Sequence, residues 1–159
     1  MQSDNIHLNE EVSGLGMIVG SFEHSLDPKK RLTIPSVWRS QIGKPQSVYV
    51  MPDLHKHCLN LYPSSEMEQK LESLRKYAMG DEAAREAFRD MGEFSEVLTW
   101  DTQGRIRVSD RLLEFAALKE RIVLLGAMDR IELWSPENRP QRKSVDQSAL
   151  RRSWEQVNI

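Results

Sequence analysis

The 159-residue sequence contains a single cysteine, Cys58, and no run of about 18 apolar residues that could form a membrane-spanning helix. One cysteine cannot form an internal disulfide, and without a CxxC partner it does not indicate a zinc site. The N-terminal residues also lack the basic and then apolar pattern of a secretory signal. The sequence therefore predicts a protein of a reducing compartment, the cytoplasm, with no membrane partner.

Motifs for common cofactors and catalytic centres are absent as well. Neither GxGxxG nor GxxxxGK occurs, so no glycine-rich phosphate loop is predicted. The HKHC stretch brings His55, His57 and Cys58 together, but zinc needs three or four converging ligands and the other histidines are His7 and His24. We interpret this stretch as a turn between strands. We predict no enzyme, no cofactor, no metal and no small-molecule substrate, with a metal-dependent hydrolase using His55 and His57 as a remote alternative.

The charge is nearly balanced, with 22 basic and 24 acidic residues and a net charge of −2. This balance argues against a uniformly basic, nucleic-acid-coating protein. The distribution is uneven, however. Residues 27–39 carry four basic residues and one acid, whereas residues 64–96 carry nine acids and five bases. The sequence therefore predicts separate basic and acidic surfaces.

An internal repeat organises the chain, because SLDPKKRLTIPSVWR (25–39) matches TWDTQGRIRVSDRLL (99–113) at an offset of 74 residues. Both copies read DxxxR followed by alternating apolar residues. The match continues farther on. SVYVM (47–51) aligns with RIVLL (121–125), and after a slip of two residues CLNLYP aligns with RIELWS.

Each copy predicts a strand, a tight polar loop, a strand, a short helix, a strand, a turn and a strand. Aspartate with proline or glycine favours a turn in both loops, and RLTI and RIRV alternate with the period of a half-buried strand. We expect the strands on either side of each loop to form a hairpin. Pro35 is predicted at the first position of the following helix, and Ser109 as the N-cap of its counterpart.

Between the copies, residues 64–91 change to a helical period and predict a solvated helical hairpin. Ser65 with Glu68 indicates a capping box, and Asp81 a second N-cap. Residues 1–16 and 136–159 are polar with weak periodicity, so we expect poorly ordered tails. The predicted units are an N-terminal extension (1–19), the first repeat (20–66), the helical insertion (67–95), the second repeat (96–139) and a C-terminal tail (140–159).

The two DxxxR copies supply the candidate functional residues. In the functional interpretation, Asp27 and Asp101 brace the turns while neighbouring side chains face phosphates or base edges. Those side chains are Lys29, Lys30, Arg31, Arg39, Gln103, Arg105 and Arg107. Arginine can bond guanine bidentately, and a two-stranded ribbon can enter the major groove. In the structural alternative, each aspartate and arginine only fix a hairpin, and the residues alone leave both interpretations open.

FEHSLDPKKRLTIPSVWR with LNLYP, and TWDTQGRIRVSDRL with DRIELWSP, resemble the paired halves of the MraZ family of bacterial regulators, in the SpoVT-AbrB superfamily. The resemblance covers roughly residues 20–137. It implies an α+β fold in which two SpoVT-AbrB-like halves form a double-split βαβ pseudo-twofold barrel with a helical insertion. It also implies ring-shaped homo-oligomers, nucleoid association and binding of double-stranded DNA at direct repeats upstream of the division and cell-wall gene cluster.

The function implied by this resemblance is a sequence-specific DNA-binding transcriptional regulator. An AbrB-like antitoxin or general nucleoid protein is the related alternative. One departure from the family pattern is Lys30, which stands where the family usually has glycine, whereas the second copy retains Gly104. Lysine tolerates a positive φ poorly, so we expect the first loop either to be reshaped or to add a phosphate contact through Lys30.

Overall fold

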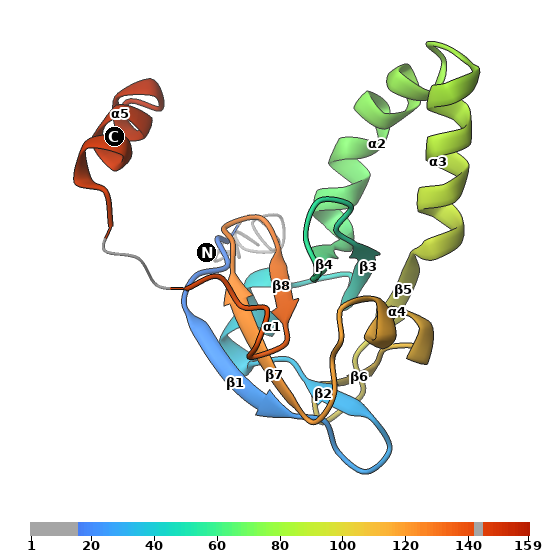
Figure 1. Ribbon diagram of the computed structural model, residues 1–159, viewed down its shortest axis with the longest axis vertical. Coiled ribbons are helices and arrows are strands. Elements are labelled where there is room, and N and C mark those ends of the chain that lie inside the picture. Colours follow the sequence, from blue (N-terminus) through green and yellow to red (C-terminus); the bar gives the residue numbers. More distant parts are fainter. Residues whose placement is uncertain (1–15, 142–144) are drawn as a thin grey trace, which may run out of the picture.

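The computed structural model describes residues 16–141 and 145–159 and shows a mixed fold of helices and antiparallel strands, which confirms the α+β prediction (Figure 1). The elements are β1 (Ser21–Ser25), β2 (Arg31–Thr33), α1 (Ser36–Ile42), β3 (Ser47–Pro52), β4 (Leu59–Pro63), α2 (Ser64–Ala78), α3 (Glu82–Phe94), β5 (Glu96–Thr99), β6 (Arg105–Arg107), α4 (Asp110–Phe115), β7 (Arg121–Gly126), β8 (Ile131–Trp134) and α5 (Gln147–Gln156). None of the helices in the described ranges is both long and apolar enough to cross a membrane.

The strands form a six-stranded sheet in the order β1-β7-β8-β4-β3-β5 and a two-stranded ribbon of β2 and β6. Each strand of the first copy has a counterpart 72 to 75 residues later in the sequence, so that β1 corresponds to β5, β3 to β7 and β4 to β8. When every strand is exchanged for its counterpart, the order of the sheet is the same read from its other end. The pairs β3 with β4 and β7 with β8 stay within one copy. The outer strands are exchanged, because β1 pairs with β7 and β5 pairs with β3. The two copies therefore share one interleaved structure.

The prediction of a local hairpin in each copy is wrong. The turn after β1 is closed by a bond from Asp27 N to Arg31 O of 3.0 Å, but the strands diverge beyond it. Leu26 N instead donates to Glu120 O at 2.8 Å, and β2 pairs with β6 of the other copy. Alternating apolar residues predict a strand but not its partner, because they specify only which face is buried.

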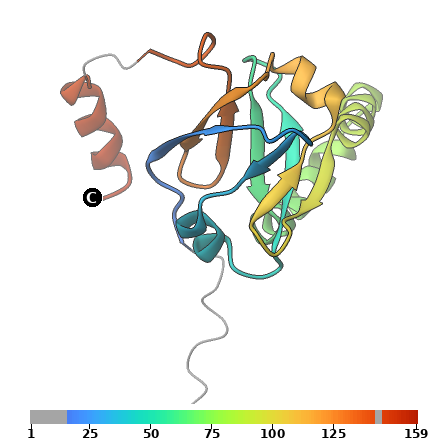
Figure 2. The same ribbon diagram turned by 90° about the horizontal axis from the view of Figure 1, so that it is seen from below.

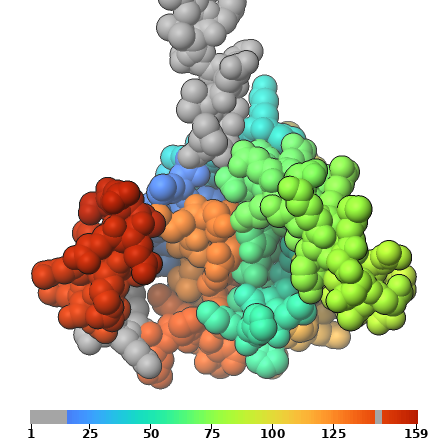
Figure 3. Space-filling view, turned by 90° about the horizontal axis from the view of Figure 1, so that it is seen from above, coloured from blue at the N-terminus to red at the C-terminus, as the bar shows by residue number. Residues whose placement is uncertain are grey.

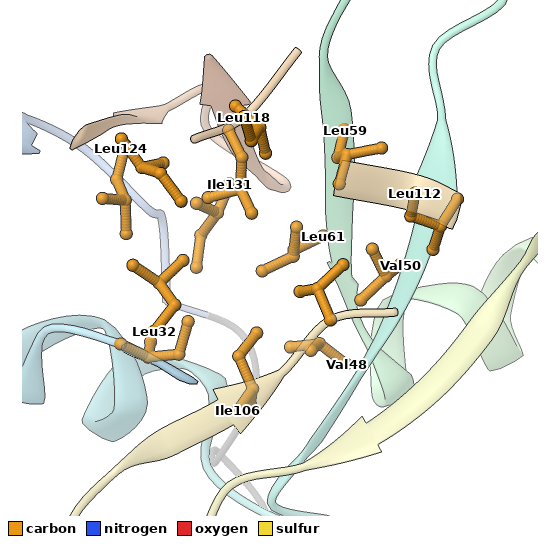
Figure 4. Packing of buried hydrophobic residues seen from close by; sticks show 14 of the residues in the cluster. Leu32, Val48, Val50, Leu59, Leu61, Ile106, Leu112, Leu118, Leu124 and Ile131 are labelled. Carbon is orange, nitrogen blue, oxygen red and sulfur yellow. The ribbon is translucent and has the colours of Figure 1, made fainter. Parts of the chain in front are cut away.

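Buried apolar side chains from both copies form one core (Figure 4). Its labelled members are Leu32, Val48, Val50, Leu59, Leu61, Ile106, Leu112, Leu118, Leu124 and Ile131. Because strands and short helices of each copy contribute to the same cluster, neither copy can bury its apolar residues alone. The repeats are therefore halves of one folding unit.

The helical insertion forms a hairpin of α2 and α3 that projects from the sheet (Figure 1). Asp81 caps α3 as predicted, since Ala84 N donates to its Oδ1 at 2.7 Å. The predicted capping box at Ser65 is wrong, because Pro63 precedes the first helical residue and no side chain caps α2. Ser109 is confirmed as the N-cap of α4, with Leu112 N donating to its Oγ at 3.4 Å. Pro35 immediately precedes α1 rather than lying in its first turn.

The C-terminal tail contains a helix, contrary to the expectation of poor order throughout. Asp146 caps α5, because its Oδ1 accepts from Ser148 N at 3.0 Å and Ala149 N at 3.1 Å. The capping residue and the apolar spacing within 150–157 are the signals that predict this helix. The expectation for the N-terminal tail lies outside the described residues up to residue 15.

Candidate nucleic-acid interface

The β2–β6 ribbon places arginines from both copies on one face. Its register pairs Arg31 with Arg107, Leu32 with Ile106 and Thr33 with Arg105. Directly opposed residues of an antiparallel pair project to the same side, and neighbours along a strand alternate. Because Leu32 and Ile106 are buried in the core, the other two pairs project outward. The outer face therefore carries three arginines and one threonine.

The first turn, at the start of β2, is organised by Asp27. Its Oδ1 accepts from the backbone nitrogens of Lys29 at 2.9 Å and Arg31 at 2.8 Å. Its Oδ2 accepts from Arg31 Nε at 2.6 Å. These bonds, with the backbone bond from Arg31 first, lower the pKa of Asp27 below its usual value. The carboxylate thus fixes the turn and the arginine that follows it.

The second turn, at the start of β6, repeats this geometry. Asp101 Oδ1 accepts from the backbone nitrogens of Gln103 and Arg105, both at 2.9 Å, and Oδ2 accepts from Arg105 Nε at 2.8 Å. The backbone bond from Arg105 is the main cause of the lowered pKa of Asp101. The DxxxR motif is therefore a self-bracing turn in both copies, as the sequence predicts for the two aspartates.

The ion pairs change how Arg31 and Arg105 must be interpreted. Their side chains are only 30% and 24% exposed, and each lies against its own aspartate. Part of each guanidinium is thus committed to the turn, as in the structural alternative. The terminal nitrogens of Arg31 nevertheless have no hydrogen-bond partner among the described residues. Bracing of the turn therefore leaves part of the Arg31 guanidinium available, and its contact with DNA stays a prediction.

Lys30 adopts the conformation of the glycine it replaces. Its φ of 57° matches the 79° of Gly104, and both turns close alike, with Lys30 N to Asp27 O at 2.8 Å and Gly104 N to Asp101 O at 2.9 Å. The expectation of a reshaped first loop is therefore wrong. The lysine Nζ lies 3.0 Å from Asp110 Oδ1 on helix α4.

Arg39 has a different place from the other candidate residues. Its Nε donates to Ile34 O at 3.0 Å, and its guanidinium packs on the second turn. A Cβ at Gly104 would come within 2.5 Å of Arg39 Cζ. Arg39 therefore supports the turn of the opposite copy. Gly104 suits this position because glycine adopts the positive φ without strain and leaves room for the guanidinium.

The exposed members of the candidate set are Lys29, Lys30, Gln103 and Arg107. Asp110, which the sequence reasoning missed, lies between two of them. Its Oδ1 is 3.0 Å from Lys30 Nζ and 3.2 Å from Arg107 Nη2, and these bonds, that from Lys30 first, lower its pKa. Its counterpart in the first copy is Ser36, so the repeat gave no signal for it.

The acidic insertion lies away from this ribbon. In Figure 1 the turn between β1 and β2 projects at the lower end of the molecule, whereas the α2–α3 hairpin rises at the upper end. Figure 2 views the molecule from the end that carries the turn. The basic and acidic surfaces that the sequence predicts are therefore separate in space.

The HKHC stretch is a loop between β3 and β4, which confirms its interpretation as a turn. His55 and His57 are exposed, and the backbone nitrogen of His55 donates to Asp53 Oδ1 at 2.9 Å. No group of three or more metal-ligating side chains occurs within the described ranges. Burial raises the pKa of Cys58 to about 12, so its thiol stays protonated and is a poor nucleophile at neutral pH.

The chain matches the model of the MraZ protein family, described as antitoxin-like, over residues 17–90 and 95–147. Three similar proteins carry the name transcriptional regulator MraZ. The protein from Clostridium acetobutylicum is 30% identical over 90% of this chain and 100% of its own length. Those from Halothermothrix orenii and Caldicellulosiruptor saccharolyticus are 35% and 33% identical, over 75% and 83% of this chain and 81% and 90% of their own. The chain therefore belongs to the MraZ family.

Proposed function

We propose that this protein is a transcriptional regulator that binds double-stranded DNA through the arginine ribbon, defined as the outer face of β2 and β6 with turns 27–30 and 101–104. The observation that carries the proposal is the placement of Arg31, Arg105 and Arg107 on one outward face, drawn from both copies. The names of the relatives support a regulatory role.

The dimensions of the ribbon suit a DNA groove. Each strand has three residues, so the two turns lie at opposite ends of a surface about 10 Å long at roughly 3.3 Å per residue. The major groove is about 12 Å wide and admits a two-stranded ribbon. The arginine ribbon would lie in the groove, with the turns beside the flanking phosphates.

The exposed and the braced side chains have different parts in this proposal. Lys29, Lys30 and Gln103 project from the turns and would contact phosphates or sugars. Arg107 is the exposed arginine and would reach base edges or phosphates. Arg31, held by Asp27 through Nε, would offer its terminal nitrogens in a fixed orientation, which favours bidentate contact with guanine. Arg105 would offer less of its guanidinium, because its Nη2 also lies 2.8 Å from Asp101 Oδ2. Arg39 would act indirectly, by holding the second turn.

The proposed regulator works as a ring of several protomers on direct repeats in a bacterial promoter of the division and cell-wall gene cluster. One ribbon is only weakly basic, because five cationic side chains stand beside the carboxylates of Asp27, Asp101 and Asp110. Several ribbons on one assembly would raise the effective concentration after the first contact. The palindromic strand order supports a pseudo-twofold barrel in each protomer. Such a protein would be cytoplasmic and nucleoid-associated, without catalytic activity.

Mobility shift on the DNA upstream of the chain's own gene tests the proposal. We expect a shifted complex that is lost when the repeats are scrambled and weakened in Arg107→Ala. The matched control is Arg89→Ala, which removes an exposed arginine from the acidic hairpin. Equal binding to intact and scrambled repeats, or equal effects of the two variants, would contradict the proposal.

An AbrB-like antitoxin or nucleoid protein is the second candidate, and the description of the family as antitoxin-like favours it. Both functions use the arginine ribbon. An antitoxin would co-purify with a toxin from its own cells, and a nucleoid protein would bind repeats and scrambled DNA alike. The mobility shift therefore separates the nucleoid protein from the regulator, and affinity purification from the native cells identifies an antitoxin.

A further inference from the structure

Helix α5 carries an apolar stripe that its own protomer leaves uncovered. Leu150 and Trp154 lie one turn apart, and Val157 continues the stripe just past the helix, an i, i+4, i+7 pattern typical of a packed face. No residue of α5 is buried, and Trp154 is 49% exposed. The residues matched by the family model end at 147, where α5 begins, so family membership does not explain this face.

A complementary apolar groove lies on the same chain between α3, α4 and the β3–β4 loop. It has a volume of about 450 Å³. Its apolar lining includes Met51, Leu54, Ala87, Met91, Phe94 and Phe115. Leu54, Phe94 and Phe115 are exposed. A groove of this size is large enough for an aromatic side chain, and buried tryptophans are common centres of binding energy at interfaces.

The charges beside the two apolar surfaces are opposite. Asp90 on α3 lines the groove, and Glu86 and Glu93 lie on the same side of that helix by their spacing of four and three residues from it. All three are exposed. None of them forms an ion pair within the described part of the chain. On α5, Arg151 follows Leu150 and lies three residues before Trp154, so it borders the apolar stripe. Arg111 packs over Phe94, so a cation also lies beside the groove.

The helix and the groove do not meet within one protomer. Figures 1 and 3 show α5 on one side of the body and the α2–α3 hairpin on the other. We propose that α5 of one copy docks in the groove of a neighbouring copy, with Trp154 between Phe94 and Phe115 and Arg151 facing Asp90. The contact joins two different surfaces head to tail, the kind of interface that closes into a ring. It deepens the ring proposed above and is independent of DNA binding.

Cross-linking between two differently tagged full-length chains tests the contact. One chain carries Lys56→Cys in the loop beside the groove and the other Ser153→Cys on α5, both with Cys58→Ala. A short bismaleimide should produce a heterodimer that adding Trp154→Glu reduces at least tenfold. Absence of the heterodimer, or efficient cross-linking only when both cysteines are on one chain, would overturn the proposal.

Charge reversal gives a second readout. Arg151→Glu should lower the heterodimer yield severalfold, and Asp90→Arg on the groove-bearing chain should restore it. Arg152→Glu, on the opposite side of α5, is the matched control and should leave the yield unchanged. Equal effects of the two arginine variants would contradict the docking geometry. Sedimentation of Trp154→Glu measures whether the ring depends on this contact. A ring that persists while the cross-link fails would be held by other surfaces.

Discussion

Arg31 and Arg107 lie directly opposite each other across the β2–β6 ribbon, one from each copy of the repeat. Like charges at such positions destabilise a strand pair by tenths of a kcal/mol to about 1 kcal/mol. Each has its own carboxylate, Asp27 at 2.6 Å from Arg31 Nε and Asp110 at 3.2 Å from Arg107 Nη2. The acids offset the repulsion while leaving the outer face cationic, an arrangement that suits a surface for polyanions.

Arg107→Ala should weaken DNA binding without disturbing either turn, because Arg107 takes no part in the aspartate braces. Loss of a base contact would cost about 1–3 kcal/mol on the specific site only. Loss of a phosphate contact would weaken binding to all sequences and reduce the slope of log affinity against log salt by about 0.9. Fluorescence anisotropy at several salt concentrations distinguishes the two. An unchanged affinity would show that DNA does not contact this face.

Gly104→Ala should destabilise the protein. The φ of +79° costs a residue with a Cβ about 1–2 kcal/mol of conformational free energy. The new Cβ would also lie 2.5 Å from Arg39 Cζ. The matched control is Gly92→Ala in α3, where a Cβ meets no atom within 4 Å and should increase the free energy of unfolding by up to about 1 kcal/mol. Urea denaturation measures both. Equal stability of the two variants would contradict the proposed packing of Arg39 on the turn.

Lys30→Gly should leave stability within about 1 kcal/mol of the parent, because glycine relieves the strain of φ 57° while losing more backbone entropy on folding. The ion pair with Asp110 is exposed and contributes little. Lys30→Gln removes the same charge but keeps the strained backbone. If Lys30 contacts a phosphate, both variants should bind DNA with a similarly reduced salt slope. A reduction in only one variant would mean that turn conformation, and not charge, controls binding.

The DxxxR turns have a pH dependence that follows from their lowered pKa values. Because the pKa values of Asp27 and Asp101 lie below the usual value of 3.8, the braces are complete above that pH and are lost as the pH falls through the lowered values. The amide signals of Lys29 and Gln103 should report this in an NMR titration. In Asp101→Asn the second turn should lose its transition while the first keeps it. A midpoint at or above about 4 would contradict the braces.

The sequence predicts the elements of this fold better than their pairing. The repeat and its turn residues correctly indicate strand, loop and short helix in both copies, because those signals are local. Exchange of β1 and β5 between the copies has no local signal, since either partner strand would satisfy the same apolar alternation. The helix α5 was not predicted, because its short apolar stripe and its Asp146 cap stand within a polar segment of weak overall periodicity.

The candidate site was also predicted only in part, because contacts between neighbouring residues leave a signal in the sequence whereas contacts between distant residues do not. The two aspartates brace the turns as expected, because an Asx turn depends only on neighbouring residues. The pairing of Arg31 with Arg107, the packing of Arg39 on Gly104 and the bridge at Asp110 all join residues more than 60 positions apart. Such contacts depend on the interleaved topology, which the repeat alone does not specify.

Cys58 should be inert in the native protein, although it lies beside two histidines. Burial raises the pKa of its thiol to about 12, so almost no thiolate exists at pH 8 and attack on a disulfide reagent is suppressed. We expect no reaction with such a reagent at pH 8 until urea unfolds the chain, and then one thiol per chain. His57→Ala should leave this protection unchanged, because burial and not a histidine controls the thiol. Rapid native reaction, or an effect of His57→Ala, would instead indicate an activated cysteine and revive a catalytic role for the HKHC loop.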